Sequence, residues 1–111
     1  MLELAGAGLS SSPDEDGVSW IEHLRTADLS VGTYVIPAGG SDPQDPHTED
    51  ELYVVRSGRA VLSGPDRQIE VSAGSVVFVA AGEQHRFEQV SEELIVIVLF
   101  GPAEGSRGGA D

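Results

Sequence analysis

Residues 39–58, GGSDPQDPHTEDELYVVRSG, decide how the rest of the chain is interpreted. This stretch places one histidine, His47, in a run of carboxylates, and it ends in an apolar strand pattern and a turn glycine. A second histidine, His85, stands in a matching strand–turn–strand context further along the chain. Two histidines in equivalent contexts indicate a metal site inside a small β-barrel.

The length and composition restrict the kinds of protein that this chain can be. Its 111 residues suffice for one hydrophobic core and are too few for two. There is no cysteine, so a metal must be held by His, Asp, Glu, Gln or Tyr. The longest apolar run, residues 94–100, is far shorter than a membrane span, and the N-terminal residues lack the basic segment of a signal peptide. We therefore expect a cytoplasmic protein.

The net charge of -13 excludes several classes of partner. Nucleic acids and anionic membranes bind clustered Lys or Arg, and this chain has only six basic residues against 19 acidic ones. All the basic residues are arginine, which excludes Schiff-base chemistry through a lysine side chain. By strand parity Arg56 and Arg86 should point outward, whereas the direction of Arg59 stays open. We therefore expect a neutral or metal-chelating small-molecule ligand rather than a phosphorylated one.

The pattern of turns and apolar residues predicts an all-β domain. Residues 1–17 and 101–111 have compositions typical of a flexible arm and a disordered tail, which leaves residues 18–100 as the domain. No segment shows helical periodicity, and a closed barrel or sandwich avoids open sheet edges. About eight short strands are expected, at residues 18–24, 29–36, 51–56, 60–63, 68–71, 76–80, 85–90 and 94–100.

The opening stretch resembles the first motif of the cupin family of small jelly-roll barrels. In that motif a glycine is followed by five residues, His-x-His, three or four residues, Glu, six residues and Gly. Here Gly39 is followed at these spacings by Asp45, His47, Glu51 and Gly58.

A second stretch resembles the second cupin motif, in which a glycine is followed by five residues, Pro-x-Gly, two residues, His, three residues and Asn. Here Gly74 is followed at these spacings by Ala80, Gly82, His85 and Gln89. Two motifs in register over roughly residues 30–100 imply a cupin double-stranded β-helix. The departures are Ala80 for the proline, Gln89 for the asparagine and, at the expected metal site, Asp45 for the first histidine.

Strand geometry supports a metal site at these positions. Residues two apart in an extended chain share a face, so Asp45, His47 and Glu51 can project together, and His85 can close the site from the opposite wall. Two imidazoles and one carboxylate leave coordination positions open and suit Fe, Mn, Ni, Zn or Co in the divalent state. Asp45 is a candidate fourth ligand; if it turns away, Gln44 or water can take that position.

Other polar residues of the chain receive different interpretations. Glu49 and Asp50 are expected to be solvated loop charges, and His23, on the first strand, a surface residue. Tyr53 shares a face with Glu51, so it is either a proton donor beside the metal or a core residue. Tyr34 and Ile36 are expected to line the same cavity, and Phe87 to point into the barrel with His85.

The resemblance implies a metal-dependent dioxygenase, isomerase or lyase, because a metal with open positions can bind an enediol, a hydroxy acid or a catechol-like substrate. The alternative is a non-catalytic domain that binds or senses a small molecule, with or without metal. A structural or storage role fits the short chain and the metal-ligand pattern least well.

The strand patterns also predict a homodimer. Residues 52–55, 76–80 and 94–100 are apolar on both faces, whereas one face of a monomeric antiparallel sheet usually meets water. A second copy packed sheet against sheet would cover the extra face. Sedimentation at micromolar concentration should therefore show a species of twice the monomer mass, and a single species of monomer mass would contradict the prediction.

Overall fold

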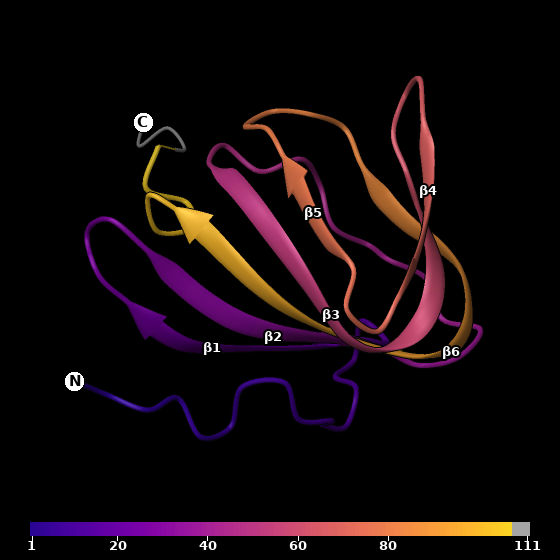
Figure 1. Ribbon diagram of the computed structural model, residues 1–111, viewed down its shortest axis with the longest axis horizontal. Coiled ribbons are helices and arrows are strands. Elements are labelled where there is room, and N and C mark those ends of the chain that lie inside the picture. Colours follow the sequence, from indigo (N-terminus) through magenta and orange to yellow (C-terminus); the bar gives the residue numbers. More distant parts are fainter. Residues whose placement is uncertain (108–111) are drawn as a thin grey trace.

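The structure, a computed structural model, describes residues 1–107, and within them every regular element is a β-strand (Figure 1). The expected all-β fold is therefore confirmed. Residues 108–111 of the predicted tail lie outside the described residues. The strands are β1 (Ser19–Arg25), β2 (Ser30–Ile36), β3 (Asp50–Ser63), β4 (Gln68–Ser72), β5 (Val76–Val79) and β6 (Arg86–Gly101).

The strands form one antiparallel sheet in the order β1-β2-β6-β3-β4, and β5 pairs with the first half of β3. β3 and β6 are long, with 14 and 16 residues, and they pair with each other over almost their whole length. Both curve strongly in Figure 1, so that β4 and β5 face the β1–β2 side across the interior. This curvature turns one sheet into a barrel.

The structure has six strands where about eight were expected, because two expected breaks lie inside strands. Ser57 and Gly58 were interpreted as a tight turn, but β3 continues through them with shifts of register against β6. Gly58 has a φ of 97°, and such bulges let a strand bend without ending. β6 likewise continues through residues 91–93.

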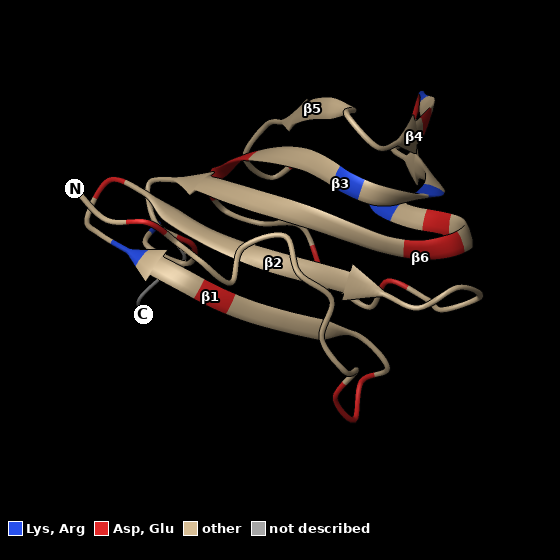
Figure 2. Ribbon diagram, turned by 60° about the horizontal axis from the view of Figure 1, so that its bottom comes forward, with Lys and Arg blue, Asp and Glu red and all other residues tan. Residues whose placement is uncertain are grey.

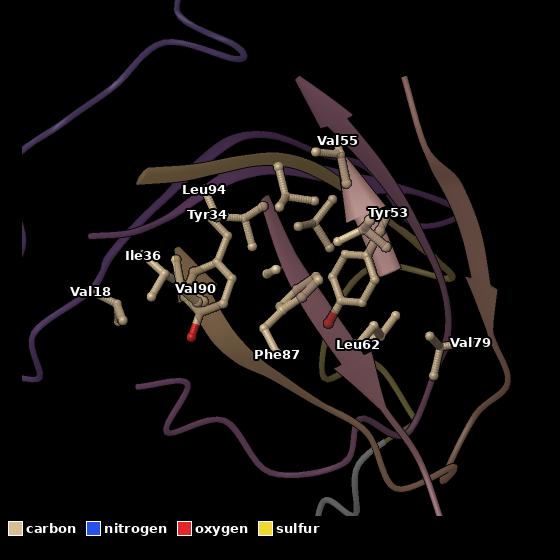
Figure 3. Close-up of a cluster of buried hydrophobic side chains, with 14 of the residues drawn as sticks. Val18, Tyr34, Ile36, Tyr53, Val55, Leu62, Val79, Phe87, Val90 and Leu94 are labelled. Atoms are coloured by element: carbon tan, nitrogen blue, oxygen red, sulfur yellow. The ribbon is translucent and has the colours of Figure 1, made fainter. Parts of the chain in front are cut away.

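Strand alternation directs large side chains into the interior, as the sequence predicts. In β3 the buried positions begin with Glu51, Tyr53 and Val55, and in β6 Phe87 lies against the ring of Tyr53 with 4.8 Å between centroids. Figure 3 shows the rings of Tyr34, Tyr53 and Phe87 in the same interior space. The core is thus aromatic near the end of the barrel from which Glu51 projects.

The outer faces are covered unevenly. The N-terminal segment passes over β2, where the Gly8 amide donates a hydrogen bond of 3.0 Å to the Thr33 hydroxyl. On the opposite side Leu52, Val76 and Phe78 are exposed, the last two at 62% and 60%. In a single copy of the chain the outer face of residues 76–80 is therefore uncovered. The homodimer that would cover it stays a prediction.

Charge is distributed as the composition suggests. Figure 2 shows Asp and Glu in the loops and on β1, β3 and β6, with Arg at only a few places. Arg56 and Arg86 are exposed, as strand parity predicts. Arg59, whose direction stayed open, is also exposed, and its Nε lies 3.5 Å from Glu92 Oε2. In the described part of the chain, no helix is long and apolar enough to cross a membrane.

Gly58, at the bulge of β3, should tolerate substitution less well than any other glycine of the barrel. A Cβ atom there would lie 2.1 Å from the Glu93 carbonyl oxygen, in addition to the strain of a positive φ. Gly74 is the matched control, because its φ is 95° but a Cβ atom would meet nothing within 4 Å. Gly74→Ala should lower the free energy of unfolding by about 1–2 kcal/mol, and Gly58→Ala by at least about 3 kcal/mol. Equal losses in urea denaturation would contradict this account of the bulge.

Candidate metal centre

The local chain brings His47, Glu51 and His85 to one end of the barrel. His47 lies in the polar loop after β2, three residues before β3 begins. Glu51 is the first inward residue of β3, and His85 immediately precedes β6. The two loops are tied together because the Gly82 amide donates a hydrogen bond of 2.7 Å to the His47 carbonyl. One ligand atom from each of the three residues lies within 4.8 Å of the others.

Glu51 lies between the two imidazoles with almost no exposure to solvent. Its Oε1 is 3.1 Å from His85 Nε2, and its Oε2 is 3.9 Å from His47 Nε2. Neither carboxylate oxygen receives a hydrogen bond within the described structure. A buried carboxylate without hydrogen bonds is costly, so this arrangement requires a positive partner such as a metal ion or a protonated imidazole.

His85 presents Nε2 to this carboxylate in a defined tautomer. Its Nδ1 lies 2.9 Å from the Glu83 carbonyl oxygen, which only accepts hydrogen bonds, so Nδ1 carries the proton. Nε2 of the neutral ring is then free to bind a metal. Burial lowers the pKa of His85, but Glu51 and the Glu83 carbonyl outweigh burial and raise the pKa above its usual value.

Tyr53 and Gln44 connect the two histidines. The Tyr53 hydroxyl lies 3.0 Å from His85 Nε2 and accepts a hydrogen bond of 3.0 Å from Gln44 Nε2. Gln44 Oε1 lies 2.7 Å from His47 Nε2. Tyr53 is thus both a buried residue and a neighbour of the predicted ligands, and its catalytic role stays a prediction. Burial, followed by the charge of Glu51, raises the pKa of Tyr53 well above its usual value, so the phenol stays protonated.

Asp42 organises this network, and the sequence analysis did not find it. The carboxylate is buried and accepts hydrogen bonds from the Tyr34 hydroxyl, the Gln44 side chain and the Phe87 amide. These bonds fix the position of Gln44 and the start of β6. In the sequence Asp42 stands next to a proline in a polar loop, where an aspartate is usually solvated, so no local signal distinguished it.

The remaining predicted residues lie in different places. Asp45 is exposed and does not belong to the group formed by His47, Glu51 and His85. It lines a second surface pocket, whose walls also include His85 and Arg86. Ligation by Asp45 stays a prediction that would need the loop to rearrange. The interpretation of His23 as a surface residue needs correction, since it is half-buried and its Nε2 lies 2.7 Å from the Thr33 hydroxyl.

The expectation that Glu49 is a solvated loop charge is wrong. Glu49 is 1% exposed, because the segment after β6 folds back over it. Its carboxylate accepts hydrogen bonds from the amides of Gly105 and Arg107, at 2.7 and 2.9 Å, and from the Thr48 hydroxyl. Burial alone would raise the pKa of Glu49, but these hydrogen bonds outweigh it and lower the pKa below its usual value.

A pocket of about 490 Å³ opens onto two of the three predicted ligands, His47 and Glu51. Its walls combine aromatic and aliphatic side chains from β1, β2 and β6 with polar residues of the loops. Four carboxylates line it and no arginine does. The lining residues are Asp14, Asp16, Val18, Trp20, Tyr34, Pro43, Gln44, His47, Glu51, Tyr53, Val98, Phe100 and Glu104. As expected, Tyr34 lines this cavity, whereas Ile36 is buried in the core.

Comparison with known proteins places this geometry in a family. The family model for the cupin domain matches residues 32–101, which run from within β2 to the end of β6. The chain belongs to the cupin family. The uncharacterized protein SCO3923 of Streptomyces coelicolor is 44% identical over 86 residues, which are 78% of this chain and 82% of that protein.

Solved cupin structures share the fold at low sequence identity. A double-stranded β-helix protein from Klebsiella pneumoniae superimposes with a TM-score of 0.75 at 18% identity, covering 98% of this chain and 92% of that one. TT1209 from Thermus thermophilus gives 0.74 at 14% identity, covering 93% and 97%. KdgF from Halomonas gives 0.70 at 19% identity, covering 79% and 82%. These matches confirm the cupin architecture.

The two buried glutamates of the cupin barrel should respond oppositely to neutralisation in metal-free protein at pH 8. Glu51→Gln removes a charge without hydrogen bonds and should raise the free energy of unfolding by about 1 kcal/mol. Glu49→Gln weakens three charged hydrogen bonds and should lower it by about 2 kcal/mol. Urea denaturation with a chelator present measures both changes.

The decrease in the free energy of unfolding caused by Glu49→Gln should depend on pH. The folded-state pKa of Glu49 is depressed, so its contribution is present above the unfolded-state pKa and disappears as the pH falls through the folded-state pKa. The difference from wild type should therefore shrink in acid below the usual pKa of 4.5. Destabilisation of similar size in both variants at pH 8 would contradict the distinction between the two sites.

Proposed function

We propose that this cupin binds one divalent transition metal through His47, Glu51 and His85 and uses it to act on a small, non-phosphorylated molecule. The observation that carries the proposal is Glu51, whose two buried oxygens lack hydrogen bonds and lie between two imidazole Nε2 atoms. A divalent cation would supply the positive charge that this carboxylate requires. The residues present therefore fit a metal.

The donor set suits Fe, Mn, Ni or Zn, because two imidazoles and one carboxylate leave positions open for other ligands. Gln44 is the protein residue best placed to contribute a fourth donor, since its Oε1 lies 2.7 Å from His47 Nε2. Water is the alternative for this position. Which metal the protein holds depends on availability in the cell as much as on the donor set.

The chemistry would be divided between the metal and the pocket. A bound metal of this type supplies Lewis-acid polarisation or dioxygen activation to a ligand on its open positions. Tyr53 holds a protonated hydroxyl 3.0 Å from His85 Nε2, where it can donate a proton or a hydrogen bond to a bound molecule. This arrangement supports a dioxygenase, isomerase or lyase; the alternative is a binding or sensor cupin in which no step follows binding.

The walls of the pocket select the class of small molecule. Asp14, Asp16 and Glu104 line it together with Glu51, and no arginine is among the lining residues of the described structure. A phosphate group would be repelled, whereas a molecule with hydroxyl groups can chelate the metal. Trp20 and Phe100 add aromatic surface, with 6.3 Å between their ring centroids.

The proposed functional unit is a homodimer. Leu52, Val76 and Phe78 form an exposed apolar patch on neighbouring strands, with Leu52 paired to Phe78 across β3 and β5. Burying such a patch against a second copy would remove apolar surface from water. A cytoplasmic location, which the sequence patterns predict, is part of the proposal.

Metal content tests this proposal directly. Purified protein should contain close to one equivalent of Fe, Mn, Ni or Zn by elemental analysis, and His47→Ala should lose it because one of three protein ligands is gone. His23→Ala is the matched control and should keep its metal, because His23 lies outside the site. The metal should also leave as the pH falls, since ligand histidines must be neutral.

The same protein can test the class of small molecule. Loaded with Co(II), it should change its visible spectrum when a hydroxy acid or a catechol is added, and not with a phosphate monoester. Absence of any metal after refolding with several divalent ions would contradict the proposal and leave metal-free binding as the function. A spectrum that responds to the phosphate monoester as strongly as to the catechol would contradict the proposed substrate class.

A further inference from the structure

The segment after β6 is held by hydrogen bonds next to the proposed metal site. The amides of Gly105 and Arg107 donate to the buried Glu49 carboxylate, and the Glu104 amide donates a hydrogen bond of 2.9 Å to the Ser30 hydroxyl. Ala103 is 2% exposed. Residues 103–107 therefore form a clasp across the end of the barrel, and part of the predicted disordered tail is in fact built into the site.

The clasp places one side chain against a predicted metal ligand. Glu104 lines the pocket, and its Oε2 lies 3.7 Å from His47 Nδ1. The side chain of Glu104 is 29% exposed and that of His47 is 18% exposed, so water screens their attraction only in part. Glu104 thus faces the nitrogen of His47 that points away from Glu51.

The two histidines differ in the group that contacts Nδ1, the ring nitrogen farther from Glu51. His85 Nδ1 is fixed as a donor by a backbone carbonyl, which leaves Nε2 for a metal. His47 has no such carbonyl partner among the described contacts, and its Nε2 instead lies 2.7 Å from the acceptor Gln44 Oε1. In this arrangement His47 carries its proton on Nε2, which is the nitrogen nearer to Glu51. Metal binding through Nε2 therefore requires the proton on Nδ1, where it needs an acceptor.

We infer that Glu104 is that acceptor and acts as a positioning residue, holding His47 in the tautomer that directs Nε2 toward the metal. Glu49 acts indirectly, because its carboxylate accepts the hydrogen bonds that hold the clasp in place. When the second ring nitrogen of a histidine ligand donates a hydrogen bond to a carboxylate, the ring is more basic and is held in a defined orientation. The inference rests on the proposed metal function, and it adds a carboxylate from a part of the chain outside the two sequence motifs.

Zinc affinity of the full-length protein tests the inference. Competition with a chelating dye should show that Glu104→Ala weakens zinc binding by roughly tenfold or more. Glu104→Gln keeps an acceptor oxygen and should recover part of the loss. Glu70 is an exposed residue of β4, and Glu70→Ala is the matched control that should bind zinc like wild type. The thermal midpoint of metal-free Glu104→Ala should stay close to that of wild type.

A spectroscopic readout separates this role from a general loss of structure. In zinc-loaded wild type, long-range ¹H–¹⁵N correlation spectra should show His47 with a protonated Nδ1 and a zinc-bound Nε2. The Nδ1 proton signal should shift or broaden in Glu104→Ala, while the His85 signals stay in place.

A double-mutant cycle tests the clasp. Glu49→Gln should weaken zinc binding in the same direction, and Glu104→Ala should add little further loss in that background, because the clasp already no longer holds residue 104 in place. Unchanged zinc affinity in Glu104→Ala, or zinc bound to His47 through Nδ1, would overturn the inference while leaving the proposed function intact. Wild-type protein that binds no zinc and no other divalent metal would overturn both.

Discussion

The site depends on one constraint, the burial of the Glu51 carboxylate at the first inward position of β3. Strand alternation forces this side chain into the barrel together with Tyr53 and Val55. Its oxygens receive no hydrogen bond, and an unpaired buried charge is among the most destabilising features that a small domain can hold. We interpret the loops that carry His47 and His85, with the polar network around them, as the structure that holds this carboxylate in position for a cation.

The two imidazoles beside Glu51 are held by different kinds of contact. His85 is fixed by the Glu83 carbonyl and by Tyr53, close to the start of β6, where Asp42 accepts the Phe87 amide. His47 lies on the loop after β2, and only side chains hold its ring. The proposed metal would therefore meet one imidazole fixed by a backbone carbonyl and one held by side chains.

Much of the fold and part of the site could be predicted from the sequence, because both follow local rules. Strand periodicity placed Glu51 and Tyr53 on one inward face, and motif spacing placed His47 and His85 at the same end of the barrel. The turn assigned to Gly58 was wrong because a positive-φ glycine serves a bulge as well as a turn. Spacing alone could not distinguish the two.

The other residues of the site depend on contacts between distant segments. The sequence around Glu49 is typical of a solvated loop, but residues 103–107 fold over its side chain. Asp42 is buried because β6 begins beside it. Asp45 occupies a motif position, yet the loop turns it outward to the surface. Parity applies to strands, and residues 37–49 between β2 and β3 form no strand.

The most direct test of the account is a crystal structure of the metal-loaded protein with anomalous diffraction recorded at the absorption edge of the metal. The account predicts a single strong peak within about 2.0–2.2 Å of His47 Nε2, His85 Nε2 and a Glu51 oxygen. A peak held only by surface carboxylates, with Glu51 still lacking a partner, would contradict it.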